Sequence, residues 1–229
     1  MLGIICAMEI EMAGIRAVMT DTEEKEISGI RFVKGKLKEC DAVAAVCGIG
    51  SVFAAMCAQT MILEYKPDYI INVGVGGALS TKLDIGNIVV AENLVQHDMD
   101  TSAIGDPIGL ISGINIIYLP TDEGLREEIE KAAEVTGHTC FKGTIASGNK
   151  FVSSAEDKKR IVELFDAMAT EMEGAPIAQV CYVNKIKCAV IRSISDRADE
   201  SATMDYEQFK AVAAKNSVDV ICKIAETRK

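Results

Sequence analysis

Three acidic clusters in the sequence have the residue types that acid–base chemistry on a small molecule requires. They are Met8-Glu9-Ile10-Glu11, Glu171-Met172-Glu173 and Ser195-Asp196. The last cluster ends an apolar, β-branched run from Cys188 to Ile194, which is typical of a buried strand that delivers a carboxylate to the end of a sheet. The middle cluster also suits the start of a helix, where the dipole stabilises acidic residues. Together the clusters predict a general acid and a general base at the ends of different elements.

Two glycine-rich segments are candidates for ligand contact. Gly74-Val75-Gly76-Gly77 follows a predicted strand, but Leu79 stands where a dinucleotide-binding motif has its third glycine. The segment Ala78–Gly86 is too short for the crossover helix of such a site. We therefore interpret these glycines as a tight turn, either purely structural or open to a ligand. Gly48-Ile49-Gly50 precedes a predicted helix that could hold an anion or a ribose hydroxyl, although an ordinary capped turn is the simpler interpretation.

Two further segments admit a functional and a structural interpretation. His97-Asp98-Met99-Asp100 has the spacing of metal ligands, but the sequence has only one other histidine, His138. Loop solvation or the capping of backbone groups is therefore the better interpretation. In Ser147–Val152, Phe151 could stack on a planar base while the neighbouring backbone reads its edge, although a core phenylalanine is the commoner outcome.

Alternating strands and helices must position these residues. The expected strands are Leu2–Ala7, Ile30–Lys36, Ala42–Cys47, Tyr69–Val75, Asn87–Val95, Cys140–Ser147, Ala167–Glu171 and Cys188–Ser195. The expected helices are Ile10–Met19, Ser51–Tyr65 with Ser51 as its N-cap, Asp122–Thr136, Ala155–Leu164 capped by Ser154, Gly174–Asn184 and Tyr206–Glu226. We expect a single α/β domain over residues 1–229, with a mixed, mostly parallel central sheet flanked by helices on both sides.

Composition argues against several classes of function. The 229 residues carry a formal net charge of −10, and no basic run exceeds Lys158-Lys159-Arg160, so binding of nucleic acid is disfavoured. The first residues lack the pattern of a secretory leader, and no apolar stretch is long enough to span a bilayer. The eight cysteines are scattered and form no Cys-x-x-Cys, as expected of small buried hydrophobic residues in a reducing compartment. We expect a soluble, cytoplasmic protein without a membrane partner.

Six motifs together resemble one family. They are Met8-Glu9-Ile10-Glu11, Gly48-Ile49-Gly50, Ile71-Asn72-Val73-Gly74, Ser147-Gly148-Asn149-Lys150-Phe151, Glu171-Met172-Glu173-Gly174 and Ile194-Ser195-Asp196. Their order and spacing, over roughly Leu2 to Lys223, are similar to those of the 5′-methylthioadenosine/S-adenosylhomocysteine nucleosidases of the nucleoside phosphorylase superfamily. The pair Glu11 and Asp196 separates this subgroup from most of its relatives.

The resemblance implies a nucleoside phosphorylase-like fold, a homodimer, no cofactor or metal, and hydrolysis of the N-glycosidic bond of these two nucleosides. The products would be adenine and a thioribose compound. Asp196 resembles the acid that protonates the purine at N7, Glu11 resembles the base that orients the attacking water, and Arg192 resembles a residue near that water. The remaining expected substrate contacts are Glu173 on the ribose hydroxyls, Met172 beneath the sugar, Phe151 and Val152 at adenine, Ser195 beside the acid, Glu171, Val75, and Met8, Ile49 and Tyr206 around the 5′-alkylthio group.

The chain departs from the family pattern at three positions. Val75 stands where the family usually has a serine near the water. Ile104 and Asp106 stand where the family usually has aromatic residues, on a loop that a second subunit inserts over the 5′ substituent. These changes leave the preferred 5′ substituent open, and Asp106 could favour the ammonium group of S-adenosylhomocysteine or simply begin a solvated turn.

Two other functions are alternatives. The first is a phosphate-dependent purine nucleoside phosphorylase, for which the acidic Thr22-Glu23-Glu24 is an unfavourable anion site and Arg31 and Arg192 are the nearest cations. The second is a non-catalytic nucleoside-binding protein, which would not need two carboxylates. For the expected dimer, one face of the helix Ser51–Tyr65 is a candidate seam, unless it packs on the sheet within one subunit. That face carries Val52, Met56, Thr60 and Leu63.

Overall fold

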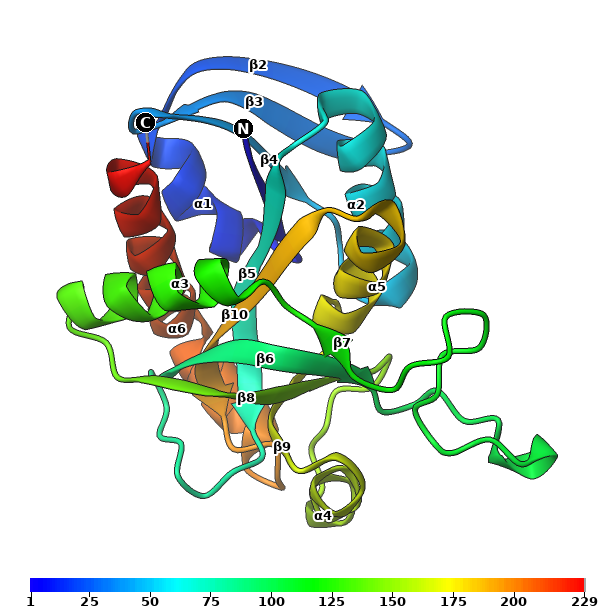
Figure 1. The fold of residues 1–229 in the computed structure, drawn as a ribbon. Helices are drawn as coiled ribbons and strands as arrows, with labels where there is room; N and C mark the ends of the chain where they lie inside the picture. The colour runs from blue at the N-terminus through cyan, green and yellow to red at the C-terminus, as the bar shows by residue number, and fades with distance from the viewer. Residues whose placement is uncertain (229) are drawn as a thin grey trace.

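Ten strands form one mixed sheet with helices on both of its faces (Figure 1). The computed structural model describes residues 1–228. The strands are β1 (Leu2–Cys6), β2 (Met19–Ile27), β3 (Ile30–Leu37), β4 (Cys40–Val46), β5 (Tyr69–Ala78), β6 (Ile88–Gln96), β7 (Leu119–Pro120), β8 (Cys140–Ser147), β9 (Ala167–Glu171) and β10 (Lys187–Asp196). The helices are α1 (Glu9–Val18), α2 (Ser51–Tyr65), α3 (Glu123–Val135), α4 (Ala155–Phe165), α5 (Gly174–Asn184) and α6 (Ala202–Thr227), with a short 3₁₀ helix, η1 (Ser102–Ile104). Five strand pairings are parallel and five are antiparallel.

Half of this sheet closes on itself. β10 pairs with β5 in parallel and with β6 in antiparallel orientation, β6 continues through β8 to β9, and β9 returns to β5. On the other side of β5, the strands β1, β4, β3 and β2 form an open extension. The closed part leaves no free edges among its five strands. It also brings three strand ends together, because Gly77 of β5 pairs with both Thr170 of β9 and Asp196 of β10.

Each face of the sheet carries its own hydrophobic layer. On one face, α2 and α5 pack against each other and bury side chains such as Met61 and Ile177. On the other face, α1, α3 and α6 bury side chains such as Met12, Ile129 and Ile221. Each buried side chain of this size contributes about 2 kcal/mol to the free energy of unfolding. The two layers therefore hold the strands, and with them the side chains at the strand ends, in fixed positions. The sequence prediction of an α/β sheet with helices on both sides is confirmed.

Most predicted elements are present, with boundaries that shift by one to a few residues. The strands β2 and β7 and the helix η1 were not predicted, and α6 begins earlier than expected, at Ala202. The prediction of a tight turn at Gly74–Gly77 is wrong, because β5 runs through these residues to Ala78. Their lack of side chains has a packing reason: a Cβ on Gly77 would lie 2.7 Å from the Asp196 carboxylate.

The start of α2 also differs from the sequence prediction. The N-cap is Gly50, with a positive φ of 99°, and Ser51 is the first helical residue. By contrast, Ser154 caps α4 as predicted, because its hydroxyl accepts the N–H of Asp157.

All eight cysteines are free thiols, and six of them are buried. Across residues 1–228, no helix combines the length and apolar character needed to cross a membrane.

Candidate active site

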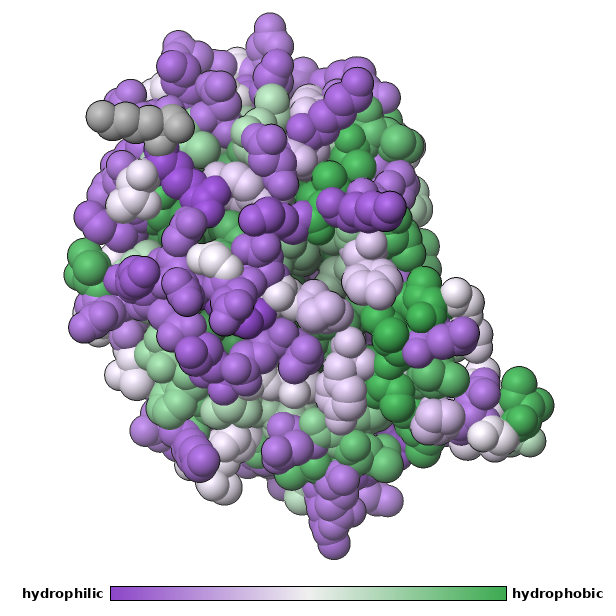
Figure 2. Space-filling view, in the orientation of Figure 1, coloured by the Kyte–Doolittle hydropathy of each residue, from purple (hydrophilic) through white to green (hydrophobic). Residues whose placement is uncertain are grey.

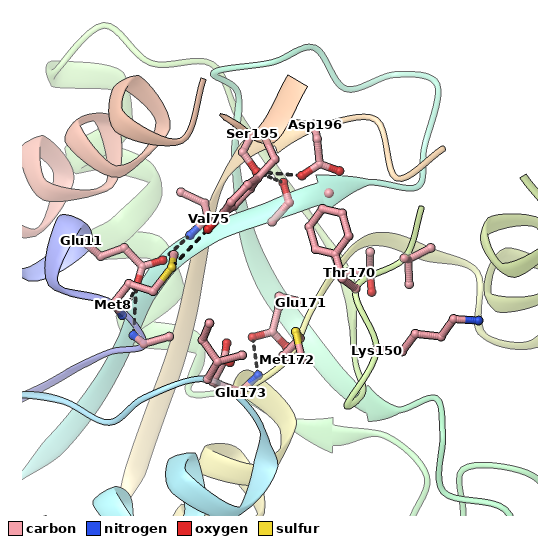
Figure 3. A pocket seen from close by; sticks show the side chains of 17 residues that line it. Met8, Glu11, Val75, Lys150, Thr170, Glu171, Met172, Glu173, Ser195 and Asp196 are labelled. Carbon is pink, nitrogen blue, oxygen red and sulfur yellow. Dashed lines mark hydrogen bonds between the residues drawn. The ribbon is translucent and has the colours of Figure 1, made fainter. Parts of the chain in front are cut away.

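A pocket of about 370 Å³ opens where β5, β9 and β10 end beside the start of α1 (Figure 3). This volume is in the range of small-molecule sites. The pocket is lined by Ala7, Met8, Glu11, Ile49, Val75, Gly76, Gly77, Lys150, Phe151, Val152, Thr170, Glu171, Met172, Glu173, Ser195, Asp196 and Tyr206. Every predicted site residue except Arg192 therefore lines this one pocket.

Glu11 lies in the first turn of α1 and is held by backbone donors. Its Oε2 accepts the N–H groups of Ala7 and Met8, each at 2.9 Å. Its Oε1 accepts the N–H of Val75 at 3.1 Å. Burial raises the pKa of Glu11, and the charge of Arg192 and these N–H groups oppose the rise. A carboxylate fixed in this way can take a proton from a bound water without first moving into place.

Asp196 and Ser195 both face the pocket, although neighbouring residues of a regular strand point to opposite faces. The register between β10 and β5 shifts between Ile194 and Asp196, and this irregularity redirects the strand end. Ser195 Oγ donates to Asp196 Oδ2 at 2.8 Å, and the Ala198 N–H donates to Oδ1 at 2.9 Å. Burial raises the pKa of Asp196, while these two hydrogen bonds act in the opposite direction. A raised pKa keeps more of the carboxyl protonated, as a general acid requires.

Glu171 and Glu173 are both buried, but they differ in what occupies their oxygens. Glu171 accepts hydrogen bonds from the hydroxyl of Ser147 and from backbone N–H groups at the start of α5, so both of its carboxylate oxygens already have protein partners. Glu173 Oε1 accepts the Gly50 N–H at 2.8 Å, and its second oxygen is free of hydrogen bonds to the described residues. Burial and the neighbouring charge of Glu171 raise the pKa of Glu173 to about 7, against the effect of Arg192 and the Gly50 N–H. Glu173 thus keeps acceptor capacity for a ligand.

Arg192 lies behind the pocket wall. The residue is only 1% exposed, and its guanidinium donates to the side chains of Glu171 and Asn72 and to the carbonyl of Ile191. The Arg192 Nη2 atom is 4.0 Å from Glu173 Oε2. Arg192 therefore affects the pocket through the charges of the glutamates, whereas the resemblance placed it beside the water.

Aromatic and apolar side chains form the rest of the wall. The rings of Phe151 and Tyr206 meet edge to face, with centroids 5.6 Å apart. The Tyr206 hydroxyl donates to Met8 Sδ at 3.1 Å, which joins α6 to the turn before α1. Ile49, Val152 and Met172 complete this surface. Such a surface suits a planar base and an apolar substituent.

The segment with metal-like spacing lies next to a loop of the pocket. The buried ring of His97 packs against Gly148, and Asp98 Oδ2 accepts the Asn149 N–H at 2.8 Å. Asp100 accepts the first N–H of η1 at 2.9 Å. The interpretation that these aspartates cap backbone groups is confirmed.

Sequence reasoning missed Thr170 as part of the wall. This threonine is buried, and its hydroxyl has no partner among the described residues. It is the penultimate residue of β9, within an ordinary apolar pattern, so only the pairing of β9 with β5 reveals its position. Lys150 was in a motif but was not assigned to the site, and its Nζ pairs with Asp157 at 2.6 Å.

Comparisons with known proteins agree with this geometry. Residues 1–226 match the model of the phosphorylase superfamily. The 5′-methylthioadenosine/S-adenosylhomocysteine nucleosidase of Shewanella loihica is 37% identical over 97% of both chains. The nucleosidase of the same name from Neisseria meningitidis, solved with methylthio-immucillin-A, superposes with a TM-score of 0.96 at 32% identity and covers 99% of both chains. The futalosine hydrolase of Helicobacter pylori superposes with a TM-score of 0.95 at 36% identity, covering 99% of this chain and 97% of its own. The fold, the pocket and these full-length similarities show that the chain belongs to the phosphorylase superfamily and, within it, to the family of 5′-methylthioadenosine/S-adenosylhomocysteine nucleosidases.

Proposed function

We propose that this enzyme hydrolyses the N-glycosidic bond of 5′-methylthioadenosine and S-adenosylhomocysteine and releases adenine. One observation carries the proposal: Glu11 and Asp196 stand on opposite sides of a nucleoside-sized pocket, and burial raises the pKa of both (Figure 3). Two carboxyl groups on opposite sides of a glycosidic bond are the arrangement for inverting hydrolysis, in which one protonates the leaving group and the other activates water.

Asp196 is the general acid in this mechanism. Cleavage of the bond places negative charge on the departing purine, and protonation at N7 turns it into neutral adenine. The Asp196 carboxyl carries that proton, and Ser195 and the Ala198 N–H keep the group aimed at the pocket. Proton transfer of this kind contributes about two to four orders of magnitude in rate.

Glu11 is the general base. Its carboxylate is fixed by three backbone N–H groups, and a water bound to it attacks the anomeric carbon from the face opposite the purine. Positive charge develops on the ribose in the transition state, and the nearby carboxylates of Glu11 and Glu173 stabilise it. Val75 also lines the pocket but has no hydroxyl for this water, so Glu11 orients the water without help from residue 75.

The substrate is held by the remaining residues of the wall. Glu173 accepts hydrogen bonds from the ribose hydroxyls, since one of its oxygens has no protein donor. Met172 packs beneath the sugar, Phe151 stacks on adenine and the Val152 backbone reads its edge. Met8, Ile49 and Tyr206 surround the apolar 5′ substituent.

A phosphorylase reaction is the weaker alternative, because the pocket offers little to a phosphate. Among the described residues that line it, Lys150 is the sole cationic side chain, and it is paired with Asp157. Arg31 lies on β3 with its guanidinium near Glu24, and Arg192 is paired inside the wall. Phosphoryl and phosphate sites need several free donors.

The test is release of adenine from 5′-methylthioadenosine, S-adenosylhomocysteine, adenosine and inosine, with and without phosphate. Futalosine joins this series, because the futalosine hydrolase of Helicobacter pylori has the same fold at 36% identity. We expect turnover of the two thioethers in phosphate-free buffer. Strict dependence on phosphate would overturn the hydrolytic assignment.

We also propose that the enzyme is a homodimer. Apolar residues gather on the flank formed by α2 and α5 and continue towards the projecting segment 97–118 (Figure 2). On α2, Val52 is 70% exposed, and Met56 and Leu63 are also exposed, so this face does not pack on the sheet of its own subunit. Ile104, 82% exposed, lies on the projecting segment, where Thr101 Oγ1 donates to Asp106. A second copy would cover these surfaces, and sedimentation at micromolar concentration tests it.

A cytoplasmic location is part of the same proposal. Eight free thiols in one chain are typical of proteins in a reducing compartment. Cell fractionation with an antibody to the chain tests it.

A further inference from the structure

The helix α2 begins without a cap of its own. Its N-cap residue is Gly50, which has no side chain to accept the first N–H groups. The cap comes from a residue 98 positions away: Asn149 Oδ1 accepts the Ser51 N–H at 2.9 Å. In return, Asn149 Nδ2 donates to Ser51 Oγ at 2.8 Å. Asn149 therefore ties the loop after β8 to the start of α2 through two hydrogen bonds.

The preceding N–H of the same turn binds a side chain that lines the pocket. The Gly50 N–H donates to Glu173 Oε1 at 2.8 Å in a buried hydrogen bond. Gly50 has a φ of 99°, which favours glycine, and a Cβ there would lie 3.1 Å from Asn149 Oδ1. Two successive N–H groups of one turn thus bind Asn149 and Glu173, so moving one partner displaces the donor of the other.

The backbone of Asn149 is anchored separately. Its N–H donates to Asp98 Oδ2 at 2.8 Å, and the next residue, Lys150, pairs with Asp157. These contacts hold the loop that carries Phe151, and they do not involve the Asn149 side chain. Removing that side chain would therefore free the turn at Gly50 while leaving the loop in place.

We propose that Asn149 is a positioning residue: its side chain fixes the Gly50–Ser51 turn so that the Gly50 N–H holds Glu173 in place for the ribose hydroxyls. The inference rests on the proposed function, because it takes Glu173 as the ribose-binding group. It links the adenine loop and the ribose contact into one unit, although they come from distant parts of the chain.

Loss of this turn has a chemical consequence at Glu173. The groups that face its carboxylate are Glu171 from β9, Arg192 from β10, Glu11 from α1 and the Gly50 N–H. The Gly50 N–H lowers the pKa of Glu173, so its loss raises that pKa further. Glu173 then stays protonated to higher pH and accepts less well from the ribose hydroxyls.

The experiment compares binding of two probes by calorimetry between pH 6 and 9. Adenine contacts only the base subsite, and the 7-deaza analogue of 5′-methylthioadenosine adds the ribose but cannot be protonated at position 7. For Asn149→Ala we expect about tenfold weaker binding of the analogue and an adenine affinity within about twofold of wild type. We also expect that the loss of analogue binding on acidification begins at a higher pH than in the wild type. Asn149→Asp keeps an oxygen acceptor for the Ser51 N–H and should stay within about threefold of wild type for the analogue.

Asp122→Ala is the matched control, because it also deletes a helix cap: Asp122 Oδ1 accepts the Leu125 N–H at the start of α3, away from the pocket. It should lower the melting temperature without changing either affinity. Equal losses for adenine and the analogue, no loss in Asn149→Ala, or a full loss in Asn149→Asp would each overturn the inference. Should the wild type bind the analogue but release no adenine from the thioether substrates, the proposed function fails and the binding comparison still decides the role of Asn149.

Discussion

Glu173→Gln should stabilise the fold at alkaline pH while it weakens nucleoside binding. Burial and the charge of Glu171 raise the pKa of Glu173 from 4.5 to about 7. The folded protein thus holds this proton more tightly than the unfolded chain does. The stability that the neutral form provides is fully present below about pH 4.5 and is lost as the pH rises through about 7.

The size of the effect follows from the two pKa values. A difference between 4.5 and about 7 corresponds to about 3 kcal/mol of unfolding free energy lost by pH 8, and about 1 kcal/mol lost by pH 5. Glutamine has nearly the shape of the protonated acid, can still accept the Gly50 N–H and does not ionise. The variant should therefore exceed the wild type by about 3 kcal/mol at pH 8, which for a chain of this size is about 6–12 °C in melting temperature.

The assay is urea and thermal unfolding of both proteins at pH 5 and pH 8. Glu23→Gln, at an exposed position on β2, is the matched control and should show no such difference. Binding of the 7-deaza analogue reports the functional loss, because the amide replaces an acceptor of the ribose hydroxyls by a donor. A stability gap that is the same at both pH values, or a variant less stable than wild type at pH 8, would refute the reasoning.

Three further predictions concern the proposed acid, the proposed base and the proposed dimer. Asp196→Asn should lower adenine release, followed by chromatography, about 10²- to 10⁴-fold while the unfolding midpoint is retained, because the amide cannot deliver a proton. Glu11→Gln should cause a loss of similar size in the same assay, because water is no longer activated. Val52→Asp should shift the mass measured by light scattering from dimer to monomer, because it places a charge on an exposed apolar face.

Each of these has a plain contrary outcome. Near-wild-type turnover in Asp196→Asn or in Glu11→Gln would remove that residue from its role. An unchanged dimer mass in Val52→Asp, with Glu64→Gln on the same helix as control, would move the interface away from α2.

The predictable parts of this structure are those in which local pattern and final environment agree. The apolar run that ends in Ser195-Asp196 is a buried strand in the structure, because β10 has neighbours on both sides and a helix layer over it. The carboxylates at element ends were also predictable, because Glu11 and Asp196 interrupt apolar sequence. Burying a charge costs free energy, so a carboxylate at such a position indicates a function.

The unpredictable parts depend on partners that are distant in sequence. The sequence pattern does not predict β2, because its residues are almost all polar and its hydrogen bonds come from β3 at the edge of the sheet. Gly76 and Gly77 are typical of turns, yet they extend β5 because β9 and β10 approach too closely for side chains. The sequence pattern predicts the nearest polar residue, Ser51, as the cap of α2, whereas the side chain that accepts the first N–H of this helix is Asn149.

The pairing of β10 with β5 also determines when the enzyme acquires activity. Ser195 and its contact on β5, Gly76, are 119 residues apart, so the pocket wall forms only after a large loop has closed. During synthesis, the proposed acid Asp196, the buried guanidinium of Arg192 and Tyr206 emerge long after β5. A chain in which β10 has not yet paired with β5 thus has helices and strands, but the proposed proton donor is not at the pocket. Recovery of adenine release is for this reason a stringent reporter of complete folding, and it should lag behind recovery of helical circular dichroism.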